Sequence, residues 1–536
     1  MAQQKWNRRD FLKTTAVGAT ALSLTAASAE RVLGANERIG VAFIGTGGRC
    51  QEHIGIVTKF QKDKKGVAAV GVCDVWDGHE EKKEWTDKKG KKHKDEYLQG
   101  LYPSAKRCGL NLDDKEHVTK DYHRILDLKE VDVVCIATPD HWHAKISIDA
   151  AAAGKDVYCE KPMTKTIDEA HAVVDAMNKY DRVMTVGVQS MADPTWQKAN
   201  ELIREGRIGH VCQAQTSYYR NYIGGQWRYY KLFKDMNPKT VDWDMFLGNK
   251  FSVKEGVPLA PEMPFDRAVF GQWRCYWPFG GGMFTDLFVH QTTHMIHAMG
   301  VRYPARVVGG GGIYLEYDER DVPDVATIIA DYNEGCQLIV TATMINDHAI
   351  EECIRGRLAT IRFITKDTSE KNKEGKPIRQ FGLEILPQDM KSGPGVPKRR
   401  ENMKGEVIMT GFKSNENDTE ALWTHYLECV RSHNRKTLCP PELGAAAFTT
   451  VNMGVQSYRG GNTLFWDAEQ RKPVPADASW AERWEKRSKD HGKPNQIAHW
   501  QGGDSGSVVV PPEYQKLAGK WVDGKDPAEH VASRNG

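Results

Sequence analysis

Short apolar runs that end in turn residues recur through the first third of the chain. They occur in "RIGVAFIGTGGRC" (38–50), "VAAVGVCDVW" (67–76) and "VDVVCIATPDHWHA" (131–144). Between them, segments such as "EHIGIVTKF" (52–60) have the apolar spacing of a helix. Strands that alternate with helices in this way predict an α/β fold built on a doubly wound parallel sheet.

The first predicted strand runs into a glycine turn of the kind that binds a dinucleotide. Gly45 and Gly47 occupy the first two positions of G-x-G-x-x-G, and Cys50 takes the third, which predicts looser packing of helix against strand. Bare backbone lets N–H groups approach a pyrophosphate at the helix N-terminus. Asp74 ends the second strand, where a carboxylate would hold the ribose 2′-hydroxyl and repel a 2′-phosphate. The pattern favours NAD over NADP, with a plain helix cap as the alternative role for Asp74.

Charge and cysteine usage exclude several classes of protein. The chain has 74 basic and 71 acidic residues, which gives no reason to expect a nucleic-acid partner. The run "EEKKEWTDKKGKKHKDE" (80–96) mixes both signs without an apolar period, so it is interpreted as a solvated insertion, with a basic docking patch as the alternative. The 11 cysteines include no CxxC pair. Cys73, Cys135 and Cys212 fall where buried strands are expected, which predicts small core residues and not disulfides.

The N-terminus has the features of an export signal. Paired Arg8 and Arg9 precede a mildly apolar run that ends in the small residues Ala27-Ser28-Ala29. This resembles a twin-arginine (Tat) signal, which delivers folded proteins to the periplasm or beyond through the Tat export machinery. An amphipathic cytosolic helix is the alternative. After residue 29 no apolar run approaches the length needed to span a bilayer, so we expect no membrane span.

Five separated motifs resemble the glucose-fructose oxidoreductase/inositol dehydrogenase (Gfo/Idh/MocA) family in order and spacing. They are "GTGGR" (45–49), "ATPDHWHA" (137–144), "EKP" (160–162), "VGVQ" followed by "ANELIREGRIGHV" (186–211) and "GGGMFTDLFVHQTTHMIHAMG" (280–300). The resemblance covers roughly residues 36–475. It implies a Rossmann domain followed by an α/β domain with a large, open, mostly antiparallel sheet that often forms an oligomer interface. Family members mostly oxidise or reduce a ring carbon of a sugar or cyclitol with NAD(P).

The resemblance assigns the candidate site residues motif by motif. Lys161 matches the lysine that contacts the nicotinamide ribose and the substrate hydroxyl, and Asp286 and His290 match the pair that closes the site from the second domain. Cofactor contacts are expected from Gly45, Gly47, Gly48, Arg49, Asp74, Thr138, Pro139, His143, Glu160 and Lys161. In chemical terms, His290 would take the hydroxyl proton, Lys161 would stabilise the alkoxide, and Asp286 would orient the imidazole. The Lys161-Pro162 bond is a candidate for the cis form.

A helix through the last motif would carry a second departure from the family. Asp286, His290 and His294 would fall at i, i+4 and i+8 on one face, with His297 three residues further on. Many family members have an acidic residue where His294 stands. Such a face could hold a divalent metal through His290 and His294. The favoured interpretation is that the site holds no metal, because a third convergent ligand would be needed.

Aromatic residues cluster before this helix. Trp273, Tyr276 and Trp277 lie in one segment, and Tyr219 and Trp227 lie in another. Flat aromatic faces suit the CH-rich faces of sugars, so one or two of these side chains are expected to contact substrate, while the others belong to the core.

An exported enzyme of this kind has no pool of free NAD to draw on. The signal therefore predicts a tightly bound nucleotide that ends each cycle in its starting redox state. A ping-pong oxidoreductase acting on a sugar, glycoside or cyclitol meets that condition. Redox-neutral glycoside cleavage through transient C3 oxidation also meets it. A non-catalytic nucleotide- or sugar-binding protein is a third alternative, disfavoured by the joint presence of Lys161, Asp286 and His290.

The expected organisation follows from these segments. It comprises a Tat signal (1–29), an NAD-binding Rossmann domain (36–190) with a charged insertion (77–120), a substrate and oligomerisation domain (191–475) and an irregular extension (476–536). A homo-oligomer with a small carbohydrate substrate is expected.

Overall fold

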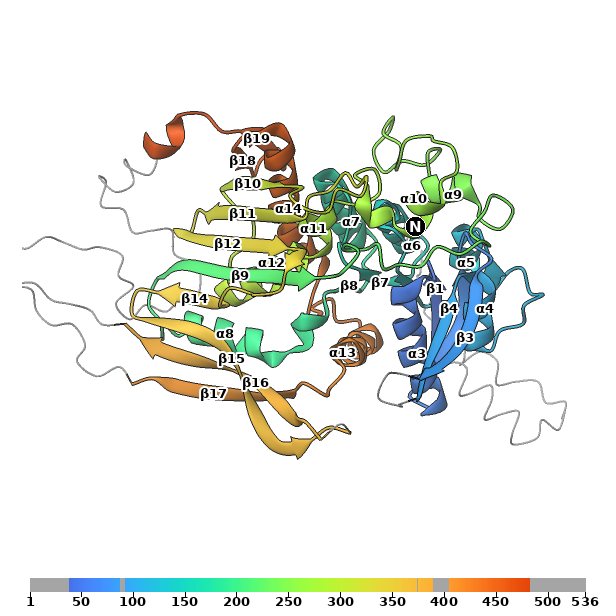
Figure 1. Ribbon diagram of the computed structural model, residues 1–536, viewed down its shortest axis with the longest axis horizontal. Coiled ribbons are helices and arrows are strands. Elements are labelled where there is room, and N and C mark those ends of the chain that lie inside the picture. The colour runs from blue at the N-terminus through green and yellow to red at the C-terminus, as the bar shows by residue number, and fades with distance from the viewer. Residues whose placement is uncertain (1–37, 87–91, 374, 389–403, 483–536) are drawn as a thin grey trace, which may run out of the picture.

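Two β-sheets form the body of the protein and lie side by side (Figure 1). The computed structural model describes residues 38–86, 92–373, 375–388 and 404–482. The predicted signal (1–29) and the predicted extension from residue 483 onward lie outside these residues. Within the described ranges, no helix has both the length and the apolar character needed to cross a membrane.

The N-terminal sheet is parallel and has the strand order β5-β2-β1-β6-β7-β8 of a Rossmann domain. Its strands are β1 (Ile39–Ile44), β2 (Val67–Cys73), β5 (Val118–Thr119), β6 (Val133–Ile136), β7 (Asp156–Glu160) and β8 (Met184–Gly187). Its helices are α3 (Gly48–Lys62), α4 (Leu101–Cys108), α5 (Tyr122–Asp127), α6 (Asp140–Ala152) and α7 (Ile167–Lys179). Every residue of β1, β6 and β7 is buried, as expected for strands covered on both faces. The predicted doubly wound parallel sheet is confirmed.

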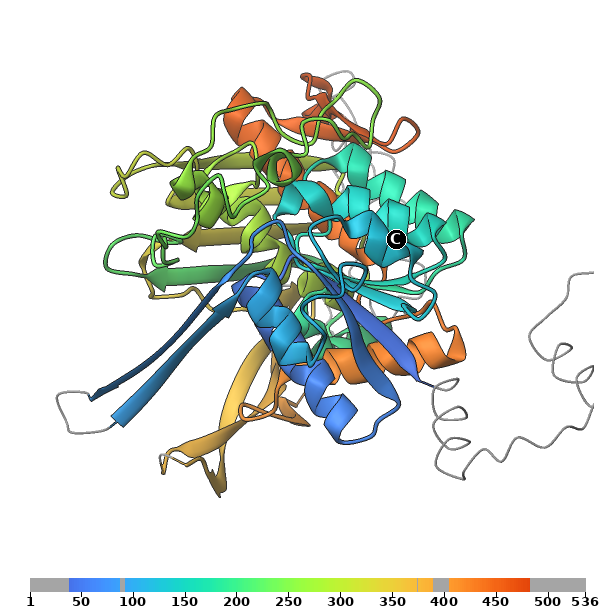
Figure 2. The same cartoon turned by 90° about the vertical axis from the view of Figure 1, so that its right-hand side faces the viewer.

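The first part of the predicted insertion (77–120) forms an antiparallel hairpin of β3 (His79–Thr86) and β4 (Lys92–Gln99), whereas α4 and β5 in its second part belong to the Rossmann domain. Figure 2 shows the hairpin extending away from the body of the domain. Neither strand pairs with another sheet, and the side chains of Glu80, Lys82 and Glu84 are exposed, which explains the lack of an apolar period. At the base of the hairpin, His79 and Tyr97 pack on Phe233. An ion pair of 2.9 Å between Lys82 and Glu96 crosses the hairpin.

The second sheet is large and mostly antiparallel, which confirms the fold class expected for this domain. Its order is β17-β16-β15-β14-β9-β12-β11-β10-β18-β19, with β13 paired to β9 and only β9 and β12 parallel among the described strands. The strands are β9 (Val211–Asn221), β10 (Arg306–Gly312), β11 (Val325–Tyr332), β12 (Cys336–Thr343), β13 (Ile345–Asn346), β14 (Cys353–Gly356), β15 (Ala359–Lys371), β16 (Pro377–Pro387), β17 (Glu406–Lys413), β18 (Leu464–Asp467) and β19 (Lys472–Pro475).

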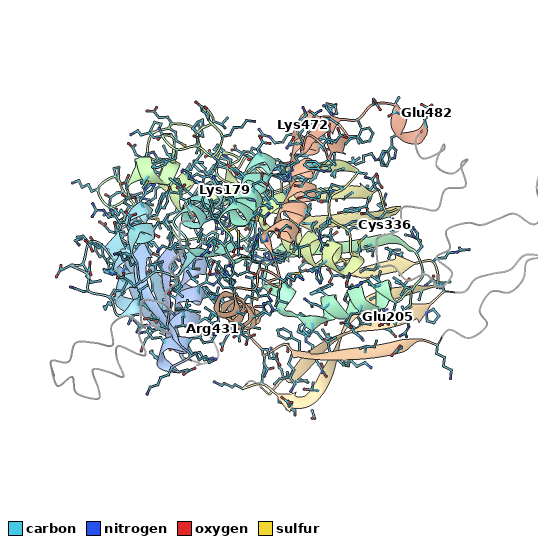
Figure 3. All side chains as sticks on the ribbon, turned by 180° about the vertical axis from the view of Figure 1, so that it is seen from behind. Lys179, Glu205, Cys336, Arg431, Lys472 and Glu482 are labelled. Carbon is cyan, nitrogen blue, oxygen red and sulfur yellow. The ribbon has the colours of Figure 1, made fainter. Side chains whose placement is uncertain are left out.

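Helices cover one face of this sheet, as the view from behind in Figure 3 shows. They are α8 (Pro194–Arg204), α12 (Phe288–Met299) and α14 (Pro441–Gly460), with the short α11 (Gly282–Asp286) at the start of α12. Residues of β11 and β12 alternate between buried and partly exposed, so only one face of each strand enters the core. The partly exposed face is compatible with the homo-oligomer, which stays a prediction.

Helix α13 (Asp418–Ser432) returns from the second domain to the first. Its apolar residues Leu422, Trp423 and Tyr426 enter the same buried cluster as Phe43 and Tyr158 of the Rossmann sheet. Figures 1 and 3 show α13 between the two sheets. The segment 191–475, expected as one continuous domain, therefore contributes a helix to its neighbour, because the apolar face of α13 completes the core beneath β7.

We expect Trp423→Ala to lower the free energy of unfolding by about 3–5 kcal/mol, the usual cost of truncating a large buried aromatic side chain. Trp423 is fully buried and stacks on Tyr158 with 4.4 Å between ring centroids. Its Nε1 donates to Nδ1 of His53 at 2.9 Å. Urea unfolding measures the loss. Trp423→Phe keeps an aromatic ring without the donor, so it should lose less. Equal losses in the two variants would contradict a packing origin.

Cys73 and Cys135 are buried as predicted, whereas Cys212 is exposed. The prediction was wrong for Cys212 because it points to the outer face of β9, where alternate residues leave the core. All 11 cysteines are free thiols.

Candidate functional site

The glycine turn opens onto a cleft of about 1110 Å³, here named the glycine cleft. Its lining includes six residues predicted to contact the cofactor, namely Gly45, Gly47, Gly48, Arg49, Thr138 and Pro139. Gly45 has a φ of +80°, and a Cβ there would lie 2.6 Å from Thr138, so only glycine fits. Gly47 caps α3 without a side-chain hydrogen bond, which leaves the N–H groups of the first turn free for an anion.

Asp74 also lines the glycine cleft. One carboxylate oxygen accepts from the Thr46 N–H at 2.6 Å, and the other accepts from the Trp76 N–H at 2.9 Å. Burial raises the pKa of Asp74, while these N–H groups oppose that shift. Asp74 caps no helix among the described elements, so its position fits the ribose contact better than the alternative role. It also holds the glycine turn in place.

We expect Asp74→Asn to narrow the preference for NAD over NADP by about fivefold or more, since a carboxylate near a phosphate repels it by at least about 1 kcal/mol. Asparagine keeps one oxygen acceptor for the turn. Quenching of tryptophan fluorescence measures binding of both nucleotides. Asp168→Asn is the matched control, because Asp168 pairs with Lys254 at 2.8 Å and both residues lie outside the cleft lining. An unchanged preference would remove Asp74 from nucleotide selection.

A second cleft, of about 1150 Å³, adjoins the first and is named here the lysine cleft. The structure brings together in it most of the remaining predicted site residues, namely His143, Glu160, Lys161, Asp286 and His290. Arg49 and Thr138 line both clefts. The two clefts therefore meet at the carboxyl ends of the parallel strands, where open α/β sheets bind ligands.

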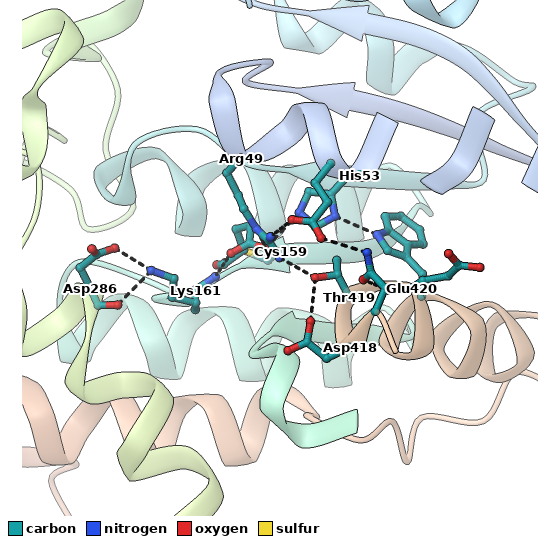
Figure 4. Close-up of polar contacts among 12 residues, drawn as sticks. Arg49, His53, Cys159, Lys161, Asp286, Asp418, Thr419 and Glu420 are labelled. Carbon is teal, nitrogen blue, oxygen red and sulfur yellow. Dashed lines mark hydrogen bonds and ion pairs between the residues drawn. The ribbon is translucent and has the colours of Figure 1, made fainter. Parts of the chain in front are cut away.

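Lys161 and Asp286 join the two domains across the lysine cleft (Figure 4). Lys161 Nζ lies 2.6 Å from Oδ1 of Asp286 and 2.9 Å from its backbone oxygen. The Lys161-Pro162 peptide bond is cis, as predicted. Lys161 carries three N–H donors, so a third remains for a ligand in the cleft.

Glu160 fixes the turn that presents Lys161. Its Oε1 accepts from Arg49 Nε and from His53 Nε2, both at 2.9 Å, and its Oε2 accepts from the Lys161 N–H at 3.2 Å. His53 Nδ1 accepts from Trp423, so the ring proton lies on Nε2. Burial alone would raise the pKa of Glu160, but Arg49 and His53 hold it well below its usual range. Glu160 is thus an ionised anchor.

His143 connects the two turns that border the cleft. Its ring lies between the carbonyl oxygens of Pro162, at 2.6 Å from Nδ1, and Thr138, at 2.8 Å from Nε2. Burial lowers its pKa. These bonds position Thr138 and Pro162, and the predicted contact of His143 with the cofactor stays a prediction.

Asp286 binds three donors, and His290 is not one of them among the described contacts. Oδ2 accepts from Trp227 Nε1 at 3.0 Å, and Oδ1 accepts from Lys161 and from Arg274 Nε at 3.3 Å. The expectation that Asp286 orients the imidazole of His290 is therefore corrected. Burial would raise the pKa of Asp286, but Lys161 and Arg274 keep it far below its usual range. Asp286 orients the lysine instead.

His290 lines the lysine cleft, and in the described part of the chain its ring makes no hydrogen bond to another protein group. Its nearest aromatic neighbour is Tyr218, with 6.0 Å between ring centroids. Burial, followed by the charge of Lys161, lowers the pKa of His290 to about 3. At neutral pH the imidazole is uncharged and has a nitrogen ready to accept a proton.

The predicted face of Asp286, His290 and His294 is not one continuous helix. α11 ends at Asp286 and α12 begins at Phe288. His294 lies outside the cleft lining, stacks on Trp196 with 3.8 Å between centroids, and bonds Glu352 through Nε2 at 3.0 Å. No group of three potential ligands in the described residues is arranged to hold a metal. His294 is committed to its protein partners.

The aromatic side chains at the lysine cleft are not those singled out from the sequence. Tyr218, Tyr229 and Tyr230 line it. Of the predicted set, Trp273 lines the glycine cleft and Trp227 is buried as a donor to Asp286. Tyr219, Tyr276 and Trp277 line neither cleft.

Several polar residues of the lysine cleft escaped the sequence analysis, namely Asp140, Ser190, Arg220, Arg274 and Gln291. Asp140 follows Thr138-Pro139 in a motif already quoted, so its position after a parallel strand was the available signal. Burial, opposed by Arg274, raises the pKa of Asp140 to about 8. Arg274 lay hidden among aromatic residues that indicated packing.

Comparison with known proteins agrees with this geometry. Residues 39–188 match the oxidoreductase family with an NAD-binding Rossmann fold, GFO_IDH_MocA. The chain is 32% identical over 174 residues to a levoglucosan dehydrogenase of Pseudarthrobacter phenanthrenivorans, a match that covers 30% of this chain and 43% of that relative. It is 26% identical over 267 residues to a glycosyl hydrolase family 109 protein of Shewanella pealeana, covering 46% of this chain and 52% of that protein. These matches span about half or less of the curated relatives.

The fold extends beyond the matched segments. The WlbA dehydrogenase of Bordetella pertussis, solved with NADH and UDP-GlcNAcA, aligns with a TM-score of 0.51 at 16% identity, over 82% of this chain and 100% of that one. Both domains therefore have the architecture of a solved dehydrogenase.

Proposed function

We propose that the protein is an NAD-dependent oxidoreductase acting on a ring hydroxyl of a sugar, glycoside or cyclitol, because residues 39–188 match the NAD-binding Rossmann fold of the Gfo/Idh/MocA oxidoreductase family. One observation carries the proposal. Lys161 of the first domain and Asp286 of the second meet at 2.6 Å in a cleft that adjoins the glycine turn.

The residues that line the two clefts fit NAD, and each would have a separate role in binding it or in the reaction. The uncapped first turn of α3 and Asp74 would hold the pyrophosphate and ribose of NAD. NAD supplies the acceptor for the hydrogen that leaves the ring carbon. The hydroxyl proton must leave as well, and the neutral ring of His290 accepts it. The remaining N–H of Lys161 stabilises the developing negative charge on oxygen.

Absorbance of the reduced nicotinamide tests the proposal on the purified, desalted full chain, with products analysed in parallel. We expect bound nucleotide that one sugar reduces and a second sugar reoxidises. Protein that retains no nucleotide and has no affinity for NAD would refute the oxidoreductase function.

Redox-neutral glycoside cleavage is the second candidate, and the similarity to a glycosyl hydrolase family 109 protein favours it. Transient oxidation at C3 acidifies the C2 proton, which allows the glycosidic bond to eliminate before water adds and the ketone is reduced. The same Lys161 and His290 would serve this route. A cleaved glycoside without net change in nicotinamide absorbance would identify it. Both routes need a cation and a neutral proton acceptor in one cleft, and Lys161 and His290 meet that need. Their joint presence argues against a non-catalytic binding protein.

The proposal includes export through the Tat machinery to the periplasm and a tightly bound, internally recycled nucleotide. The support is the twin-arginine pattern at residues 7–29, since no NAD pool replenishes a cofactor lost outside the cytoplasm. Cell fractionation of the full chain tests it, and purely cytoplasmic protein would contradict it. The proposal also includes homo-oligomerisation through the large sheet. Light scattering measures the mass in solution, and the mass of a monomer would contradict it.

A further inference from the structure

Arg220 differs from the other cations of the lysine cleft in its partners. It lies one residue before the end of strand β9, lines the cleft and is half-buried. Its Nη2 donates to the Tyr218 hydroxyl at 2.6 Å, and its guanidinium lies 4.8 Å from the centre of the same ring. Within the described ranges it makes no ion pair with a carboxylate, whereas Lys161 and Arg274 each pair with Asp286, and Arg49 pairs with both Glu52 and Glu160.

The charges around the cleft do not balance. Glu160 pairs with Arg49, but the single carboxylate of Asp286 serves both Lys161 and Arg274. Arg220 adds another positive charge. Asp418 is a third carboxylate of the lining, and burial raises the pKa of Asp140 to about 8, which favours its neutral form. Four cations, Arg49, Lys161, Arg220 and Arg274, thus face three carboxylates. The lining therefore carries an excess of positive charge.

Partly buried guanidinium groups normally have an anionic partner, because removing a charge from water without one is costly. The fork of N–H donors on arginine matches a carboxylate or a phosphate-like group. Contact with the Tyr218 ring holds the Arg220 fork in a fixed place, so little side-chain entropy is lost when it binds a ligand. The same ring lies 6.0 Å from His290, so the anion site and the proton acceptor are one side chain apart.

We propose that the lysine cleft binds an anionic sugar, and that Arg220 holds its carboxylate or acidic ester group. This inference rests on the proposed function and names its substrate class. Arg220 is a specificity-determining residue that contacts substrate away from the reacting carbon. The carboxylate of a uronate and the sulfate or phosphate of an acidic sugar ester share the required chemistry.

The test uses the full chain loaded with NAD and pairs of sugars that differ only in charge. Glucose and galactose, with their methyl glycosides, are compared with the matching uronates, 6-sulfates and 6-phosphates. Titration calorimetry measures binding, and nicotinamide absorbance measures KM and kcat. We expect at least one acidic sugar to bind about tenfold or more tightly than its neutral counterpart, with the preferred member distinguishing uronate from ester.

Arg220→Gln should raise KM for the acidic sugar by about 10–100-fold, leave its kcat within a few-fold, and leave neutral sugars nearly unchanged. Arg357→Gln is the matched control, because it removes the same charge from an exposed residue beside the opposite end of β9. Equal losses for acidic and neutral sugars would show a structural role and overturn the inference. Turnover of neutral sugars with no preference for acidic ones would overturn it while leaving the proposed function intact. No response to any sugar by nucleotide-loaded protein would instead refute the proposed function itself.

Discussion

Lys161→Met lowers kcat by about 10²–10³-fold, the usual loss when a single group that stabilises a developing oxyanion is removed. The reason is geometric. Lys161 is the cation that Asp286 holds across the lysine cleft, with 2.6 Å between Nζ and Oδ1. Methionine keeps much of the side-chain volume without the N–H donors. Single-turnover reduction of bound nicotinamide, followed by absorbance after mixing with sugar, measures the loss directly.

The same variant should leave the fold and the nucleotide in place. Asp286 keeps Trp227 and Arg274 as donors, so its charge stays compensated after the change. Lys198→Met is the matched control, since Lys198 pairs with Glu201 at 3.0 Å on α8 and neither residue lines either cleft. Lys161→Arg keeps the charge and should recover part of the rate. A full rate in Lys161→Met would remove this residue from the mechanism.

His290→Gln is expected to lower kcat by about 10²–10⁴-fold, the range for loss of a general base. Its pH dependence makes the assignment specific. The neutral imidazole is the form that accepts a proton, and burial together with Lys161 lowers its pKa to about 3. The wild-type protein should therefore keep its kcat/KM as the pH falls from about 8 to about 5, where a histidine of ordinary pKa near 6.5 would already be protonated.

His297→Gln provides the comparison for this prediction. His297 is two turns further along α12 and lies outside the lining of the lysine cleft. It should keep both the rate and the pH profile. A wild-type acid limb centred near pH 6.5 would contradict the effect of burial on His290. An unchanged rate in His290→Gln would show that His290 is not the group that accepts the hydroxyl proton.

Local patterns carried most of what the sequence predicted. Gly45 and Asp74 are found where the glycine turn and the end of a parallel strand require them, because those positions depend on residues close in sequence. The parallel order of the first sheet follows from alternating strands and helices for the same reason. Placement of Lys161 and Asp286 in one cleft came from the family resemblance, since no local signal joins residues so far apart in the chain.

Hydrogen bonds and ion pairs between residues far apart in the chain could not be predicted from the sequence. Trp227 was expected either to contact substrate or to belong to the core, and Arg274 was not singled out, yet both bind Asp286. Asp286 was wrongly expected to bind His290 because helical spacing places it one turn before that histidine. In the structure its carboxylate instead binds the cations Lys161 and Arg274. The strands β3 and β4 lack an apolar face, so alternation gave no sign of them.

The return of α13 to the first domain also constrains the order in which the chain can fold. Trp423 reaches His53 across 370 residues of sequence, so the core beneath β7 cannot close until nearly the whole chain has been synthesised. Until then Tyr158 lacks Trp423 as its stacking partner, so a nascent Rossmann domain exposes apolar surface. Such surface binds chaperones or promotes aggregation. Expression of residues 36–190 alone should therefore give a poorly soluble domain, whereas supplying residues 418–432 as a fused helix should restore its solubility.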